Sequence, residues 1–237
     1  MRPTFLVLST EPISEFRKQN KTLISAGEDL LWLEWQLISI VLLAGDVFAP
    51  TARLALQELH SYHREACLLA MRKSPNVGLA MTRMACELSR DLILLILDKD
   101  MDALWHNREA DSKRYRQEFR FDRIEGVFAD KFYELYKLSS RFGVHGHTNL
   151  LQTPNLGSKS SLGDHLTVQI DGNFVLSSYV LALRSIEMFL HSFLHHLGLH
   201  LPVSNNALRR DLSIVVEQLN AIHVPADMPK ARGKDLH

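Results

Sequence analysis

The sequence predicts a mainly α-helical fold, a helical bundle of about six to seven helices with one β-hairpin inserted at about residues 165–176. Long segments carry apolar residues three and four positions apart, the spacing that places them on one face of a helix. Hydrophobic residues make up 46% of the 237 residues, which is enough for a large buried core. The hairpin is indicated by apolar and polar residues that alternate on both sides of Asp171-Gly172.

Three long helices are predicted up to residue 98. Residues 29–48 are apolar on nearly all sides, which is typical of a helix at the centre of a bundle, and Pro50 ends this helix. The segment 51–73 begins with a threonine N-cap, keeps a helical apolar pattern and stops before Pro75. A third helix is predicted over 77–98.

Four more helices complete the predicted bundle. They lie at 101–120, which is strongly charged, and at 122–142, 176–199 and 206–222. The hairpin precedes the sixth helix, because Asp-Gly between two alternating runs favours a tight turn. We expect one helical domain over residues 1–237, with a disordered tail at about 225–237.

Charge and cysteine content favour a cytoplasmic protein. Lys plus Arg and Asp plus Glu both number 27, so no net charge attracts nucleic acid or an anionic membrane. Cys67 and Cys86 lie inside helical apolar patterns, which indicates reduced, buried thiols. The apolar segment 30–44 is too short to span a membrane and contains Glu34, so we expect a buried helix there and no membrane span.

A charged pair interrupts the apolar pattern of the third helix. Arg83 and Glu87 stand four residues apart among leucines, and Arg90 follows three residues later, so all three lie on one helix face. Three interpretations fit this spacing: a surface ion pair, a buried pair that holds neighbouring helices in register, and part of a catalytic or ligand site. The sequence leaves all three open.

Small, polar and imidazole-bearing residues gather at the end of the fifth predicted helix. Ser139 falls on its apolar face, so the hydroxyl needs a partner, and a backbone carbonyl one turn back is the nearest one. Gly143 then disfavours further helix, which leaves His145 and His147 on a turn. Capping by these histidines is one interpretation. A second is a binding or catalytic pocket formed by Arg83, Glu87, Tyr136, Ser139 and His145, and a third is a metal site.

No metal or cofactor is expected. His191 and His195 share a helix face, but no carboxylate or thiolate pattern supplies further ligands. The sequence also contains no glycine-rich phosphate loop and no dinucleotide fingerprint.

The order of these residues carries a first resemblance. Arg83-x3-Glu87, a charged helix, then Tyr136-x2-Ser139 and His145 resembles a family of bacterial helical proteins of unknown function. Its members are helical bundles, some of them found near defence and abortive-infection systems. The resemblance implies a fold more than an activity. With the mixed pocket above, it favours a binding or regulatory module for an unknown protein or small ligand.

A second resemblance points to an enzyme. Arg141 and His147 are separated by five residues, which is similar to the spacing in ribonucleases of the HEPN type, also helical bundles. The resemblance implies metal-independent RNA cleavage, with Arg141 steadying a phosphate and His147 moving a proton. HEPN sites are assembled across a dimer, so it also implies a homodimer. Phe142 and the nearby glycines depart from the HEPN pattern, and the ribonuclease is the alternative to the binding module.

Overall fold

The computed structural model describes residues 11–44, 48–72, 74–98, 100–124, 128–143, 172–200 and 206–221. These ranges contain nine α-helices and one short 3-10 helix, so the mainly α-helical fold predicted from the sequence is confirmed. The helices are α1 (Glu11–Gln19), α2 (Lys21–Leu43), α3 (Pro50–Met71), α4 (Pro75–Leu97), α5 (Met101–His106), α6 (Ser112–Glu118), η2 (Phe121–Arg123), α7 (Phe128–Gly143), α8 (Gly172–His200) and α9 (Asn206–Ala221).

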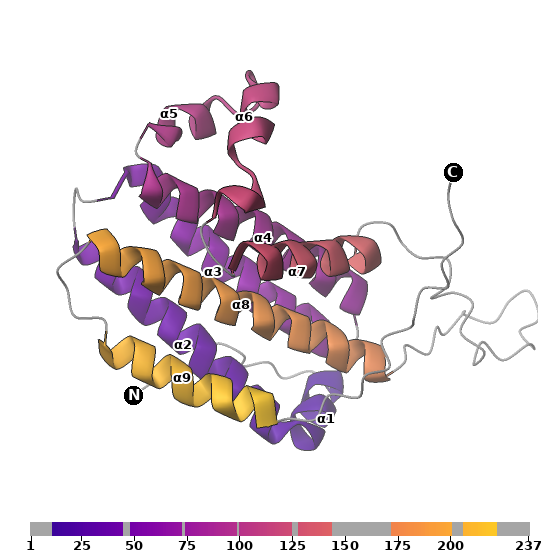
Figure 1. Cartoon of the computed structure of the whole chain (residues 1–237). Coiled ribbons are helices and arrows are strands. Elements are labelled where there is room, and N and C mark those ends of the chain that lie inside the picture. Colours follow the sequence, from indigo (N-terminus) through magenta and orange to yellow (C-terminus); the bar gives the residue numbers. More distant parts are fainter. Residues whose placement is uncertain are drawn as a thin grey trace, which may run out of the picture.

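The bundle is organised around α4 and α8. Helix α8 packs against α2, α3, α4, α7 and α9, and α4 packs against α3, α7 and α8 (Figure 1). Near the N-terminal ends of the two central helices, Ser178 Oγ in α8 donates to the carbonyl oxygen of Pro75 in α4 at 3.1 Å. Helix α7 packs against both α4 and α8.

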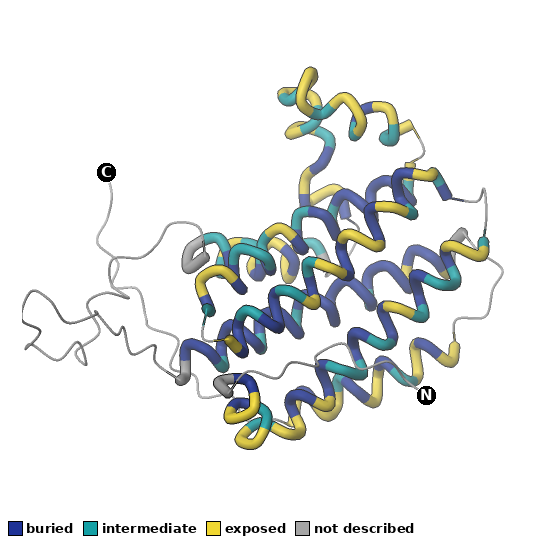
Figure 2. Tube along the Cα trace, turned by 180° about the vertical axis from the view of Figure 1, so that it is seen from behind, coloured by how far each residue is buried: buried dark blue, intermediate teal, exposed yellow. Residues whose placement is uncertain are grey.

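Buried apolar side chains of all the long helices form one contiguous core. Figure 2 shows this as buried segments along the inner sides of the long helices, with exposed segments on their outer sides. Within the described residues, one segment, Phe174–Gly198 of α8, is long and apolar enough to cross a membrane. In its apolar 18-residue stretch, 72% of the residues are buried inside the bundle, as expected of a core helix.

A short arm, consisting of α5 and α6, projects from the end of the bundle (Figure 1). The sequence predicted one continuous helix over 101–120, and this is wrong. Helix α5 ends where the backbone and side-chain amides of Asn107 both donate to the carbonyl oxygen of Ala103. Helix α6 restarts at a cap in which the Asp111 side chain accepts from the backbone N–H of Arg114. Asn and Asp favour such caps over helix interiors.

The predicted β-hairpin at about 165–176 is not supported. No strand occurs in the described ranges, and residues 172–176 form the beginning of α8, so the second strand is wrong; residues 165–171 lie outside the described residues. Burial explains the difference, because it follows a helical spacing from the start of α8. The buried positions there include Phe174, Val175, Ser178, Tyr179 and Ala182.

The first two helices also differ from the prediction. Helix α2 begins at Lys21, eight residues before the predicted start, and α1 was not predicted. The prediction of a disordered tail at about 225–237 concerns residues outside those that the structure describes.

Candidate functional site

Three of the five residues predicted to form a pocket meet between α4 and α7. Arg83 Nε donates to Glu87 Oε1 at 3.1 Å, and both side chains are partly exposed. The Arg83 guanidinium lies 5.4 Å from the centre of the Tyr136 ring, within the range of a cation–π contact. The pair is therefore not an isolated surface ion pair, because it also ties α4 to α7.

The other predicted residues do not join this group within the described structure. Ser139 is buried and its Oγ donates to the carbonyl oxygens of Leu135 and Tyr136, at 2.8 and 3.1 Å, so its hydroxyl is satisfied within α7 as the sequence suggested. His145 and His147 lie outside the described residues. Arg141 belongs to the last turn of α7, but its side chain is also outside them.

A buried polar network lies further along α4, where Arg90, grouped with Arg83 and Glu87 from the sequence, meets Asp91, which sequence reasoning missed. Asp91 Oδ1 accepts from Arg90 Nε at 2.8 Å and from Arg90 Nη2 at 2.6 Å. Asp91 Oδ2 accepts from the Tyr115 hydroxyl at 2.6 Å and from Trp105 Nε1 at 3.1 Å. Because Trp105 belongs to α5 and Tyr115 to α6, one carboxylate holds both helices of the arm against the bundle.

Burial and the partners of Asp91 shift its pKa in opposite directions. Burial raises the pKa of Asp91 above its usual value, although Arg90 and the hydrogen bonds from Tyr115, Arg90 and Trp105 act in the lowering direction. Burial and the neighbouring Asp91 also raise the pKa of the Tyr115 phenol. Arg90 Nη2 donates to the same phenol oxygen at 3.1 Å, which orients the hydroxyl hydrogen toward Asp91.

A cavity of about 450 Å³ opens beside this network, between α6, η2 and α7, and is called the α6–α7 cavity below. Its described lining combines five aromatic rings, three arginines and two aspartates. These are Tyr115, Phe119, Phe121, Tyr133 and Tyr136, with Arg90, Arg116 and Arg120, and Asp122 and Asp130. Tyr136 thus connects the predicted group around Arg83 to the cavity.

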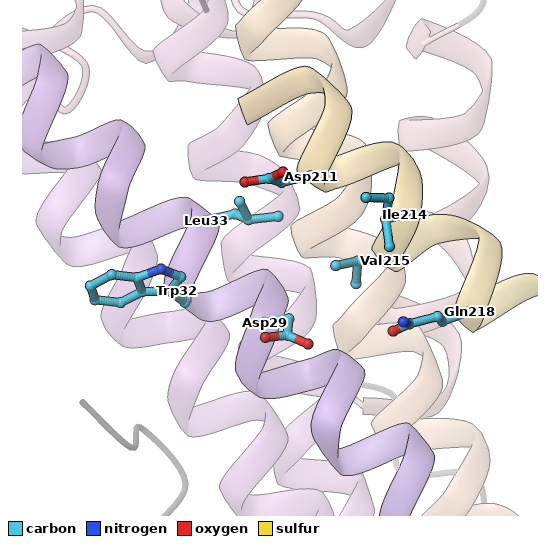
Figure 3. Close-up of a pocket in the computed structure, with 7 residues that line it drawn as sticks. All are labelled: Asp29, Trp32, Leu33, Asp211, Ile214, Val215 and Gln218. Atoms are coloured by element: carbon cyan, nitrogen blue, oxygen red, sulfur yellow. The ribbon is translucent and has the colours of Figure 1, made fainter. Parts of the chain in front are cut away.

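A second, smaller cavity of about 200 Å³ lies between α2 and α9. Figure 3 shows Asp29 on α2 and Gln218 on α9 extending toward each other, with Leu33 and Val215 between the two helices. Ligand sites generally occupy about 300 to 1,000 Å³. The α2–α9 cavity falls below this range and the α6–α7 cavity within it, so the latter is the better candidate site.

A third polar group is enclosed between α2 and α3. Glu34 is fully buried, and its two carboxylate oxygens face two histidines of α3: His63 Nδ1 lies 2.6 Å from Oε1, and His60 Nδ1 lies 2.8 Å from Oε2. A carboxylate only accepts, so both Nδ1 atoms carry the donated hydrogen. His63 Nε2 is buried with no hydrogen-bond partner among the described residues.

The two histidines govern the ionisation of Glu34. Burial alone would raise the pKa of Glu34, but the charges and hydrogen bonds of His63 and His60 outweigh it and lower the pKa to about 2. Each imidazole uses its Nδ1 atom for the hydrogen bond to Glu34. In the described part of the chain, no group of three or more His, Cys, Asp or Glu side chains is placed to hold a metal ion.

Comparisons of the chain with protein-family models, with curated proteins and with solved structures give no match. The fold and the site together define a mainly α-helical protein with an aromatic-lined cavity of ligand size. The cavity lies next to an arm that is hydrogen-bonded to the bundle through Asp91.

Part of this site could have been found from the sequence. Tyr133 and Tyr136 are spaced to share a helix face, and aromatic residues recur through Tyr115, Phe119 and Phe121 in an otherwise charged segment. Such a run of rings in a polar region is a signal for a binding surface.

Proposed function

We propose that this protein is a helical binding module that takes a small ligand into the α6–α7 cavity and responds through the arm. The observation that carries the proposal is the lining of the cavity. Ligand sites are concave and largely apolar, with a few fixed polar groups that orient the ligand. The five aromatic rings that line the cavity, together with the fixed Arg90 guanidinium, match that description.

The regulatory part of the proposal rests on Tyr115. Its ring lines the cavity, while its hydroxyl donates to Asp91, which also accepts from Trp105 of α5. A ligand that contacts Tyr115 therefore acts on the group that anchors both arm helices. If it binds one position of the arm more tightly than another, it shifts the arm toward that position. The arm would then present this change to a protein partner.

The proposed setting is a reducing cytoplasm. Cys67 and Cys86 are free and fully buried, and burial raises the pKa of both thiols. Such thiols are unreactive and act as small apolar side chains, which fits a compartment that keeps cysteines reduced. A role in bacterial defence remains a proposal that rests on the first resemblance.

A fragment screen followed by thermal unfolding tests the proposal. Ligands that raise the unfolding temperature of the wild type should lose their effect in Tyr133→Leu, which removes an exposed ring of the cavity. The same ligands should keep their effect in the control Tyr62→Leu, which alters a tyrosine of α3 outside the cavity. Hits that ignore Tyr133, or a screen without hits, would count against a ligand site here.

The ribonuclease alternative depends on Arg141 and His147, whose side chains lie outside the described residues. It therefore remains a prediction of the sequence, as does the homodimer that it implies, and a cleavage assay decides it.

A further inference from the structure

We propose that the ligand of the α6–α7 cavity is a guanine nucleotide, with the base on the aromatic wall, its acceptor edge at Arg90 and its phosphate at Arg116. This inference deepens the proposed function and rests on it. Three features of the cavity carry the argument: a wall of aromatic faces, a fixed donor beside it, and an arginine without a neutralising carboxylate.

The wall is built from α7 and η2. The Tyr133 and Tyr136 rings are nearly parallel, with 13° between their planes and 6.4 Å between their centres. Phe121 lies 5.9 Å from Tyr133 and 5.3 Å from Tyr136. Tyr133 is 43% exposed, and Lys137 Nζ lies 4.1 Å from the centre of its ring, which leaves the other face for a ligand. Aromatic faces of this kind hold planar bases by stacking.

The fixed donor is Arg90. Its Nε and Nη2 atoms are used by Asp91 and Tyr115, and its guanidinium lies 5.2 Å from the centre of the Phe121 ring. No described residue accepts a hydrogen bond from Nη1, while Arg90 lines the cavity. Nη1 is therefore the guanidinium nitrogen left to donate to a ligand, from a group that is already oriented. Guanine presents two adjacent acceptors, O6 and N7, to an arginine.

The charges around the cavity distinguish Arg116 from its neighbours. Arg90 is neutralised by Asp91, and Arg120 pairs with Asp122. Arg116 bonds only to the carbonyl oxygen and hydroxyl of Ser112 among the described residues, so its charge stays uncompensated by a carboxylate. An arginine of this kind attracts a phosphate.

The acidic lining residues favour guanine over other bases. Asp122 and Asp130 line the same cavity and can only accept hydrogen bonds when ionised; Asp122 already accepts from Arg120, so Asp130 is the acceptor assigned to the base. Guanine has the donors N1–H and N2–H₂ on the Watson–Crick edge, which adjoins its O6/N7 edge, whereas hypoxanthine lacks the amino group. A cavity with both an arginine donor and an aspartate acceptor therefore complements guanine on two edges.

Calorimetric titration of the full chain with GMP, guanosine and IMP tests the inference. GMP should bind, and IMP should bind at least about fivefold more weakly because it lacks the amino group. Tyr133→Leu should weaken GMP binding by about tenfold, the loss of affinity expected for one stacking ring. Arg116→Gln should weaken GMP by a similar factor and leave guanosine within about twofold. The matched control Arg64→Gln, an exposed arginine of α3, should change neither.

The same nucleotide could come free in solution or as part of single-stranded RNA. A uridine hexamer that carries one guanosine, compared with the all-uridine hexamer, separates these sources. Tighter binding of the guanosine hexamer than of GMP assigns the site to RNA, and weaker binding assigns it to the free nucleotide. Either result supports a guanine site, provided that Tyr133→Leu weakens it.

Absence of heat from GMP and guanosine at millimolar concentration would overturn the inference, as would binding that is indifferent to Tyr133→Leu. The proposed function is tested separately by the fragment screen. Hits that depend on Tyr133 alongside inert GMP would remove the guanine assignment and keep the binding module. If no ligand of any kind depends on Tyr133, both the guanine assignment and the binding module are wrong.

Discussion

Replacing Glu34 by glutamine should destabilise the protein strongly and remove part of its sensitivity to acid. Glu34 is fully buried, and each of its carboxylate oxygens faces a histidine nitrogen of α3. A glutamine amide keeps one acceptor oxygen, but its NH₂ group then meets the Nδ1–H of the other histidine. That histidine must change tautomer or leave a buried donor without a partner, which costs free energy.

The size of the effect follows from the pKa of the carboxyl group. His63 and His60 lower the pKa of Glu34 from 4.5 to about 2 against the cost of burial. At 1.36 kcal/mol for each pH unit, the ionised form contributes about 3 kcal/mol to the free energy of unfolding. Because the folded pKa lies below the unfolded one, this contribution is present above about pH 4.5 and is lost as the pH falls toward about 2.

Urea unfolding followed by circular dichroism at neutral pH and at about pH 3 measures this contribution. Glu34→Gln should lose about 3 kcal/mol at neutral pH, and the gap to the wild type should narrow at about pH 3. Glu65→Gln, which alters a partly exposed carboxylate of α3, should change stability by less than about 0.5 kcal/mol. A gap that is small at neutral pH, or equal at both pH values, would refute the reasoning.

Three further predictions test other parts of the structure. Asp91→Asn should lower the free energy of unfolding by about 3 kcal/mol, because Arg90 is left buried without its counter-charge, and should speed limited proteolysis within the arm. The control Asp98→Asn, at the exposed end of α4, should change neither. Gly27→Ala should lose about 1 to 3 kcal/mol in chemical unfolding, since its Cβ would lie 2.5 Å from the Tyr179 hydroxyl oxygen, and adding Tyr179→Phe should recover part of the loss; no recovery would contradict the clash. If the ribonuclease alternative holds, the protein cleaves RNA in EDTA and His147→Ala abolishes cleavage at an unchanged thermal transition; an inert wild type ends that alternative.

Helical periodicity was sufficient to predict the bundle, because the long helices bury a stripe that repeats every three to four residues. It failed where a local pattern allowed two structures. Residues 172–176 alternate like a strand over a short distance, yet Phe174 and Tyr179 belong to a buried helical face that continues through α8. The arm was read as one helix because charged residues alone do not reveal the Asn107 and Asp111 caps.

Local spacing likewise predicted only part of the site. Arg83 and Glu87 are four residues apart on one helix, so their pairing could be read from the sequence, and the structure adds Tyr136 from α7. The Glu34 group depends on how α2 packs against α3, which spacing does not specify. The sequence does contain a signal for this group. Glu34 is an acid in an otherwise apolar helix, and His60 and His63 lie one turn apart in the next helix.

Fluorine NMR of protein labelled with 3-fluorotyrosine tests the central claim most directly, because the chain contains five tyrosines. Tyr115, Tyr133 and Tyr136 line the α6–α7 cavity, whereas Tyr62 and Tyr179 lie elsewhere and serve as internal controls. Titration with GMP, or with the best hit of the fragment screen, should shift the three cavity resonances and leave the other two in place. A ligand that binds without shifting the cavity resonances, or that shifts Tyr62 and Tyr179 instead, would contradict the account.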